Sequence, residues 1–272
     1  MNETREHRTH RIYNWTKQQP DSRDRKFAEI PLVKRLKVLT APKVVNLRRW
    51  CSEVEDQEEL GSCTGQAWVG LMEFHENFMG RGGKTYKDLS RLFVYYNERV
   101  LEDTVDEDAG AELRSGAKAL VKWGVCLEKN WPYKINAFNQ KPTPQCYTDA
   151  AIHKVNSYYS ISTFNHLKLC LANNLPVVFG FLVYDSFESD IVTQTGIVPM
   201  PNIETESLLG GHAVMAVGYN DYEKRFLVRN SWGNKWGLKG TNAGYFTMPY
   251  DYIANSNLAS DFWTVVRIAE DV

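Results

Sequence analysis

The stretch that decides the fold reads Gln57-Glu58-Glu59-Leu60-Gly61-Ser62-Cys63-Thr64-Gly65-Gln66-Ala67. It places a glutamine amide six residues before a cysteine that begins a predicted helix. A helix N-terminus and an adjacent imidazolium both lower the pKa of a thiol from its free value of about 8.5. The side-chain amide of Gln57 and the backbone N–H of Cys63 suit the oxyanion of a tetrahedral intermediate. The pattern therefore predicts a nucleophilic Cys63 with Gln57 as its oxyanion donor.

The residues after Cys63 predict a helix from Thr64 to Met79. One apolar stripe and then a second follow its length, made by Ala67, Leu71, Phe74 and Phe78 and by Trp68, Met72 and Met79. A helix that is apolar on two faces is buried. Its N-terminus, and Cys63 with it, is therefore expected to be held rigidly.

A base and a residue able to orient it follow in the motifs Gly211-His212-Ala213-Val214 and Asn230-Ser231-Trp232-Gly233. His212 can take the thiol proton and later return it to a leaving amine, while the amide oxygen of Asn230 accepts the other ring N–H. Residues 212–219 and 225–230 read as strands around the turn-forming residues 220–223. A hairpin folded about Asp221 sets His212 directly opposite Asn230, within side-chain reach.

Each motif alone also has a structural explanation. A cysteine at a helix start is often a small buried hydrophobe, a histidine before a strand is usually a satisfied polar residue, and Asn-Ser-Trp-Gly can be a turn. The order Cys, His, Asn, the glutamine spacing and the hairpin register agree with one another. Together they favour the catalytic interpretation.

These residues resemble the papain-like cysteine proteases, in a prokaryotic-type branch with a short N-terminal prosegment. The resemblance runs from about residue 41 to the end, through Ala41-Pro42, Gly124-Val125, Trp131-Pro132-Tyr133, Trp236-Gly237 and Gly244-Tyr245-Phe246. It implies catalytic roles for Gln57, Cys63, His212 and Asn230. It also implies substrate-binding roles for Trp232, beside the His–Asn pair, and for Gly110 and Ala111, where such enzymes carry a Gly-Gly pair. The chain departs from the family at Thr64, Leu60 and Gly211.

The resemblance implies an α+β, papain-like two-lobe fold, with a helical left lobe, an antiparallel β-rich right lobe and the active-site cleft between them. Further helices are expected at Leu89–Leu101, Glu112–Trp123 and Thr163–Ala172, and further strands at 176–183, 244–248 and 262–268. Residues 195–209 read as a loop. Cys63 is expected on one lobe and His212 on the other. A chain of 272 residues, 43% of them hydrophobic, can bury the core that this fold needs.

We expect residues 1–40 to form a basic N-terminal arm, a prosegment, and residues 41–272 to form the catalytic domain. Papain-like proteases are made as zymogens, and this arm is too short for a long helical prodomain. The arm carries apolar anchors at Tyr13, Trp15, Phe27, Ile30, Leu32 and Val33, and an acidic run before Cys63 at Glu53, Glu55, Asp56, Glu58 and Glu59 could receive its positive charge. Self-processing is expected near residues 33–38. The alternative is that the arm is an integral part of the fold.

Three functions stay open from the residues. The leading one is an endopeptidase that acts on a peptide or protein substrate through a Cys63 acyl-enzyme, with the arm as intramolecular inhibitor. An acyl transferase or deamidase could use the same Cys–His–Asn site on another amide. A catalytically silent binding homologue is the third, and the intact set of four site residues argues against it.

Composition argues against other classes of partner. The arm is basic, but the rest of the chain is acidic and repels phosphate, so no nucleic-acid partner is expected. No apolar run reaches membrane-spanning length, no zinc-ligand spacing occurs, and no metal, cofactor or signal peptide is expected. Five cysteines do not form a disulfide framework, although one bridge among Cys51, Cys126, Cys146 and Cys170 stays open. The protein is expected to be cytoplasmic, or secreted by a route without a visible signal peptide.

Overall fold

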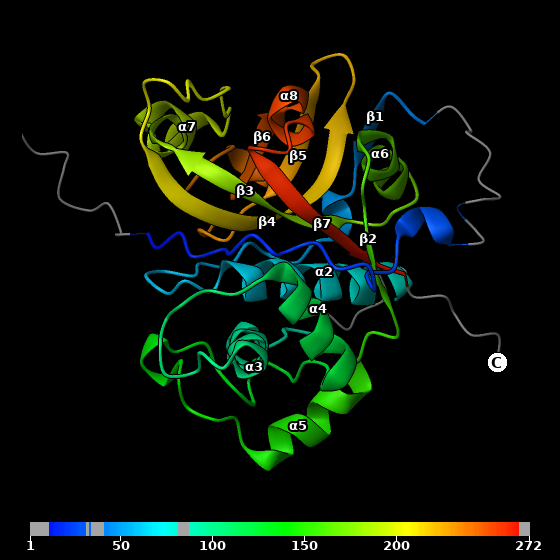
Figure 1. Cartoon of the computed structure of the whole chain (residues 1–272), viewed down its shortest axis with the longest axis vertical. Coiled ribbons are helices and arrows are strands. Elements are labelled where there is room, and N and C mark those ends of the chain that lie inside the picture. Colours follow the sequence, from blue (N-terminus) through cyan, green and yellow to red (C-terminus); the bar gives the residue numbers. More distant parts are fainter. Residues whose placement is uncertain (1–10, 31–32, 34–40, 81–86, 267–272) are drawn as a thin grey trace, which may run out of the picture.

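The computed structural model describes residues 11–30, 33, 41–80 and 87–266. Within these ranges the chain forms a helical lobe and a β-rich lobe, one below the other in Figure 1. The helix that begins at Cys63 lies where the lobes meet. The expected α+β two-lobe architecture is confirmed.

The helical lobe contains helices α2 (Cys63–Met79), α3 (Arg91–Glu102), α4 (Leu113–Lys122) and α5 (Pro144–Ala150). Helix α2 begins at Cys63 as predicted, and its first thirteen residues are buried. Helix α3 begins two residues later than predicted because the Ser90 hydroxyl accepts a hydrogen bond from the backbone N–H of Phe93 and fixes the start. Sequence reasoning missed α5, whose signals are the Thr143 cap and Pro144 in the first turn.

The other lobe is built on an antiparallel sheet in the order β2-β7-β3-β4-β5-β6, with β1 paired to β4. The strands are β1 (Val44–Asn46), β2 (Tyr158–Ser160), β3 (Val177–Tyr184), β4 (Leu208–Asn220), β5 (Arg225–Arg229), β6 (Tyr245–Pro249) and β7 (Ala259–Val265). Strand β7 begins three residues before the predicted strand at 262–268, and residues 267 and 268 lie outside the described chain. Helices α6 (Phe164–Ala172), α7 (Asp190–Thr195) and α8 (Tyr250–Ala254) complete this lobe. Residues 195–209 run mainly as the expected loop into β4.

Short 3₁₀ turns connect these elements. They lie at Phe27–Glu29, Arg48–Trp50, Ile135–Ala137, Ala151–His153, Asp185–Glu188 and Gly240–Asn242. Within the described ranges, none of the helices combines the length and apolar character that crossing a membrane requires.

The predicted register of the β4–β5 hairpin is wrong. The pairs are Asn220 with Arg225, Tyr219 with Phe226 and, beyond an irregularity, Met215 with Arg229. The turn is therefore longer than a hairpin folded about Asp221 allows, and Lys224 takes left-handed backbone in it with φ of 51°. His212 lies beyond the last β4–β5 pair and is instead opposite Phe181 of β3.

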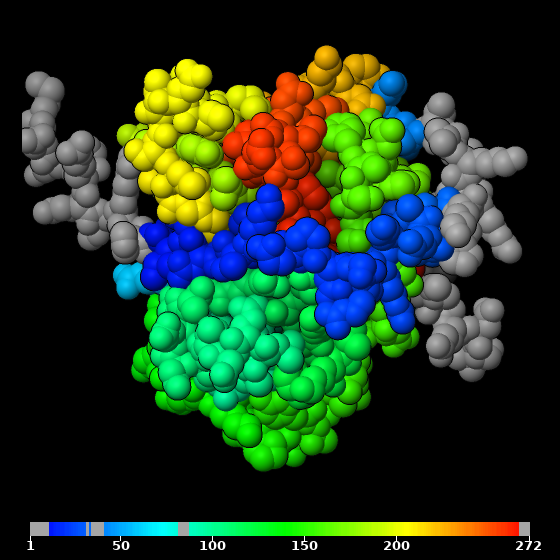
Figure 2. Space-filling view, viewed as in Figure 1, coloured from blue at the N-terminus to red at the C-terminus, as the bar shows by residue number. Residues whose placement is uncertain are grey.

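The described part of the N-terminal arm runs between the two lobes rather than outside them. Residues 11–30, in dark blue, cross the face shown in Figure 2 along the boundary between the helical lobe and the sheet. Trp15 and Phe27 from this segment are buried in the main hydrophobic core cluster. The arm therefore contributes to packing as well as covering the cleft.

Candidate active site

Cys63 is the first residue of α2, and its side chain is completely buried. The backbone N–H groups of Thr64 and of Ala213, the residue after His212, face the sulfur and favour the thiolate. Burial outweighs them and raises the pKa of the thiol to about 12, with smaller contributions from the carboxylates of Glu98 and Asp108. The lowered pKa expected from the helix N-terminus is therefore not present while the cleft is covered.

His212 on β4 and Asn230, directly after β5, meet through their side chains. His212 Nε2 lies 2.8 Å from Asn230 Oδ1, and the same oxygen accepts the backbone N–H of Ser231 at 2.9 Å. The other ring nitrogen of His212, Nδ1, is buried without a hydrogen-bond partner in the described structure. Burial lowers the pKa of His212 to about 4, so the imidazole is neutral at pH 7.

Trp232 lies over this pair. Its ring stacks on His212, with ring centroids 5.0 Å apart and an interplanar angle of 23°. Phe187 packs against Trp232 at 5.5 Å, and Trp236 packs against it at 4.8 Å. This aromatic cluster covers the His212–Asn230 pair, and a substrate-binding role for Trp232 stays a prediction.

Gln57 is buried just before α2 and is bonded at both ends of its amide. Its Oε1 accepts the Ser231 hydroxyl at 2.6 Å, and its Nε2 donates to the Leu60 carbonyl at 2.9 Å. An amide nitrogen carries two hydrogens, so one donor remains for another acceptor. Ser231 was not predicted as a site residue, although it stands inside the Asn-Ser-Trp-Gly motif.

The arm runs through the cleft and bonds to both lobes by its backbone. On the β side, Trp15 N donates to Gly211 O at 2.9 Å and Gly211 N donates to Tyr13 O at 3.3 Å. On the helical side, Thr16 N donates to Ala111 O at 3.2 Å. Gly110, with φ of 71°, leaves so little room that an added Cβ would lie 1.8 Å from Asn14 O. Of the predicted substrate-binding pair, Ala111 thus accepts a backbone hydrogen bond from the arm, and Gly110 lies close against the backbone of Asn14.

Two aromatic side chains of the arm fill the cleft. The ring of Tyr13 packs edge-on against His212 at 5.9 Å and against Trp232 at 6.0 Å. The indole of Trp15 lies on Gly180 of β3, where an added Cβ would come within 1.9 Å of the ring. Trp15 is 6% exposed, and Cys63 is not exposed at all. Neither the role of Gly180 nor that of Gly211 in seating Trp15 was predicted.

The acidic run before Cys63 contacts the arm at one end. The guanidinium of Arg11 lies 4.0 Å from the ring centroid of Trp232 and 3.9 Å from Asp56. Asp108, which the sequence did not suggest, accepts the backbone N–H of Gly61 at 3.0 Å through Oδ2. Its backbone carbonyl accepts from Asn14 Nδ2 at 2.7 Å, so the loop that carries it supports both α2 and the arm.

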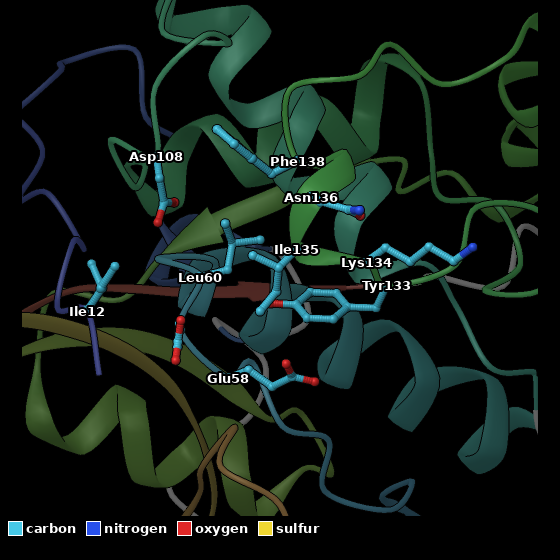
Figure 3. A pocket seen from close by; sticks show the side chains of 10 residues that line it. Ile12, Glu58, Leu60, Asp108, Tyr133, Lys134, Ile135, Asn136 and Phe138 are labelled. Atoms are coloured by element: carbon cyan, nitrogen blue, oxygen red, sulfur yellow. The ribbon is translucent and has the colours of Figure 1, made fainter. Parts of the chain in front are cut away.

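The arm leaves an open hollow of about 770 Å³ beside this site. Figure 3 shows Ile12 of the arm at one side, Leu60 and Ile135 within, and the carboxylates of Glu58 and Asp108 at its edges. The hollow is lined by apolar side chains, by the carboxylates of Glu58, Glu59 and Asp108, and by the Lys134 ammonium.

The site combines a thiol at a helix N-terminus, a histidine hydrogen-bonded to an asparagine, and a hydrogen-bonded glutamine amide. This combination defines the site of a cysteine peptidase. Residues 41–265 match the family model described as Papain family cysteine protease, and the chain belongs to that family. All five cysteines are unpaired in the structure.

Relatives agree with this assignment. The chain is 44% identical over 239 residues to an uncharacterized peptidase C1-like protein, L477, of Acanthamoeba polyphaga mimivirus, covering 85% of this chain and 74% of the relative. It is 29% identical over 220 residues to cysteine proteinase 3 of Entamoeba histolytica, covering 79% of this chain and 65% of that proteinase. Among solved structures, xylellain, a cysteine protease from Xylella fastidiosa, superimposes with a TM-score of 0.84 at 37% identity, covering 94% of this chain and 96% of that one. The chain is a cysteine peptidase by family and by fold.

Proposed function

We propose that this chain is a papain-like cysteine endopeptidase held latent by its own N-terminal arm. The observation that carries the proposal is the contact of the arm with His212 and its neighbours, with Tyr13 against the imidazole and Trp15 bonded to Gly211, while Cys63 is fully buried. A substrate cannot reach the thiol while these residues stay in place.

In the open enzyme, His212 Nδ1 takes the proton of Cys63, and the thiolate attacks the carbonyl carbon of the scissile bond. The free N–H of the Gln57 amide and the backbone N–H of Cys63 donate to the oxyanion. His212 then gives its proton to the leaving amine and afterwards activates the water that hydrolyses the acyl-enzyme. Asn230 holds the imidazole through the 2.8 Å hydrogen bond to Nε2.

Latency in this proposal has an electrostatic component as well as a steric one. Burial in the closed cleft raises the pKa of Cys63 to about 12 and lowers that of His212 to about 4, so both groups are neutral when the cleft is closed. Exposure to water removes the main cause of both shifts. Opening the cleft therefore favours the thiolate–imidazolium pair that the reaction needs.

An acyl transferase or deamidase remains the alternative because it would use the same four residues. The hollow beside Glu58 and Asp108 favours the peptidase, since it offers room for further residues of an extended chain. Amine release from peptide amides supports hydrolysis of peptide bonds. Ammonia release or amine incorporation would support the alternative.

The test compares the full chain with its Trp15→Ala and Tyr13→Ala variants, using a fluorogenic peptide amide and labelling by an epoxide peptidyl inhibitor. We expect low activity in the full chain, higher activity in both variants, and a label that maps to Cys63. Cys63→Ala in the Trp15→Ala background is the control and should abolish hydrolysis while the protein stays folded. Hydrolysis that survives this control would refute the assignment of Cys63.

A further inference from the structure

The described arm consists of two parts that contact the molecule differently. Residues 11–16, the cleft segment, lie over the active site. Residues 18–30, the anchor segment, continue beyond the cleft along the surface of the catalytic domain (Figure 2). Lys17 joins the two and is exposed, as is Thr16 before it.

The cleft segment buries polar atoms that find no partner. Tyr13 Oη and Trp15 Nε1 are both buried without a hydrogen-bond partner in the described structure. A buried donor left unpaired loses its hydrogen bond to water without replacement. The cleft segment therefore binds less favourably than its buried area suggests, as suits a segment that has to leave.

The anchor segment bonds to the rest of the molecule through both side chains and backbone. Arg114 donates to both carboxylate oxygens of Asp24, at 3.0 and 2.7 Å, and to the Gln19 carbonyl at 2.8 Å. The Arg25 carbonyl accepts the backbone N–H of Ser160 at 2.8 Å. Phe27 is 1% exposed in the main core. Removing these residues would uncover apolar surface and leave the buried Arg114 without its closest carboxylate.

The bond between Lys17 and Gln18 lies at the boundary of the two segments. Gln18 N donates to Asp261 Oδ2 at 2.9 Å, and Trp263 Nε1 donates to Gln18 Oε1 at 3.2 Å. Asp261 has left-handed backbone, with φ of 58°, a conformation that aspartate adopts more readily than most residues other than glycine. Lys17 and Arg114 are the cations that act on Asp261.

We propose that the Lys17–Gln18 bond is a processing site, and that the anchor segment stays in the mature enzyme as part of its structure. Water adds across the C–N bond, leaving a carboxylate on Lys17 and an α-amine on Gln18. The new ammonium then lies beside the Asp261 carboxylate, where the amide nitrogen already is, and the hydrogen bond becomes an ion pair. The cleft segment loses its tether and dissociates, because its binding is no longer intramolecular.

This inference rests on the proposed latency and places the functional boundary well before residue 40. Val33 is buried at 9% exposed, and residues 34–38 of the predicted processing region lie outside the described chain. A cut there would leave the cleft and anchor segments joined to each other. The two sites therefore make different products.

Point variants of the uncut chain first distinguish the role of the cleft segment from that of the anchor segment. Tyr13→Ala should speed labelling of Cys63 by an epoxide peptidyl inhibitor and leave the thermal midpoint nearly unchanged. Phe27→Ala should lower the thermal midpoint by several degrees and leave labelling slow. Fast labelling in Phe27→Ala with an unchanged midpoint would contradict an anchoring role.

The deciding experiment cuts two versions of the full chain with a lysine-specific endoproteinase. Lys17 is the sole lysine before residue 41 in the variant Lys26→Gln/Lys34→Gln/Lys37→Gln, whereas Lys17→Gln/Lys26→Gln keeps Lys34 and Lys37. The first should lose residues 1–17 by intact mass, stay folded, and label Cys63 about tenfold faster or more. The second should stay slow to label after it is cut. Adding Asp261→Asn to the first should lower the midpoint more in the cut than in the uncut protein.

Resistance of Lys17 to cleavage, retention of residues 1–17 after the cut, or equal acceleration in the second protein would overturn the inference. So would unfolding of the first protein on cleavage. A cut protein that labels at Cys63 but hydrolyses no peptide would instead refute the proposed peptidase function and leave the processing site standing. Hydrolysis by the uncut Trp15→Ala variant would support the peptidase function. If cleavage at Lys17 then failed to activate the chain, the processing site would be refuted and the peptidase function would stand.

Discussion

His212 and Asn230 bond to each other at 2.8 Å although the strands that carry them do not pair them. The β4–β5 ladder ends at Met215 and Arg229, and the two side chains reach across beyond it. Their contact therefore depends on side-chain packing, with Trp232 stacked on the imidazole, rather than on a shared rung of the sheet.

Asn230→Ala should reduce kcat less than His212→Ala does, because the base remains present and loses only its orientation. We expect roughly a tenfold loss for Asn230→Ala and a loss of about 10³-fold or more for His212→Ala, measured in a Trp15→Ala background. Trp232→Phe is a matched control that keeps an aromatic cover over the bond. Equal losses for Asn230→Ala and His212→Ala would show that Asn230 does more than orient the ring.

Gln57→Ala should lower kcat by about 10²–10³ with a smaller change in KM, because an oxyanion donor acts mainly on the transition state. Ser231→Ala removes the 2.6 Å hydrogen bond that fixes the Gln57 amide, and should have a weaker effect of the same kind. Steady-state kinetics on a peptide amide, again with Trp15→Ala, measures both. A change in KM alone would make Gln57 a substrate-binding residue.

Gly180→Ala should activate the uncut chain. The added methyl group would lie 1.9 Å from the Trp15 indole, so the ring cannot keep its place. Labelling of Cys63 should accelerate toward the rate of Trp15→Ala, and combining the two substitutions should add little further, because both act by removing the same contact. Gly240→Ala is the control, since an added Cβ there meets no atom within 4 Å, although its φ of 65° carries some strain. Unchanged labelling in Gly180→Ala would mean that Trp15 does not hold the cleft closed.

Acid should open the cleft. The closed form holds the pKa of His212 at about 4 against an ordinary value of 6.5, so closure is fully favoured above pH 6.5 and weakens as the pH falls toward 4. The difference corresponds to a loss on the order of 3 kcal/mol. Asp261, whose pKa burial raises to about 6, contacts the anchor segment through Gln18 and should not oppose release of the cleft segment.

Hydrogen exchange measures this opening without an activity assay. The backbone N–H groups of Trp15 and Gly211, which carry the bonds between arm and sheet, should lose protection between pH 6.5 and 4 after correction for intrinsic rates. His212→Gln should flatten the dependence. Protection that stays constant with pH in the unsubstituted protein would remove His212 as its cause.

The sequence predicted the parts of the site that depend on local pattern. Cys63 begins its helix because the apolar stripes after it define a buried element, and the lobes could be assigned from the change between helical and alternating patterns. The predicted register of the β4–β5 hairpin was wrong because one irregularity and a longer turn shift every residue pair. Neither feature can be recognised from the types of residue at those positions.

Other contacts could not be predicted because they join segments that are distant in the sequence. Asp108 was not expected to hold Gly61, since nothing in an acidic loop tells which backbone it will meet. Gly180 reads as an ordinary strand residue until Trp15 is placed over it. The apolar anchors of the arm were visible in the sequence, but not that Tyr13 packs against His212 while Trp15 and Phe27 are buried in the core.

Neighbouring residues of the arm bond to opposite lobes, Trp15 to Gly211 and Thr16 to Ala111. The covered protein is therefore crosslinked across its cleft by one short strand. While that segment is in place, the two lobes are held together, and the covered molecule should melt in a single cooperative transition. Once the strand leaves, the lobes regain relative motion, so the active enzyme is expected to unfold over a broader range and to adapt the width of its cleft to the chain it cuts.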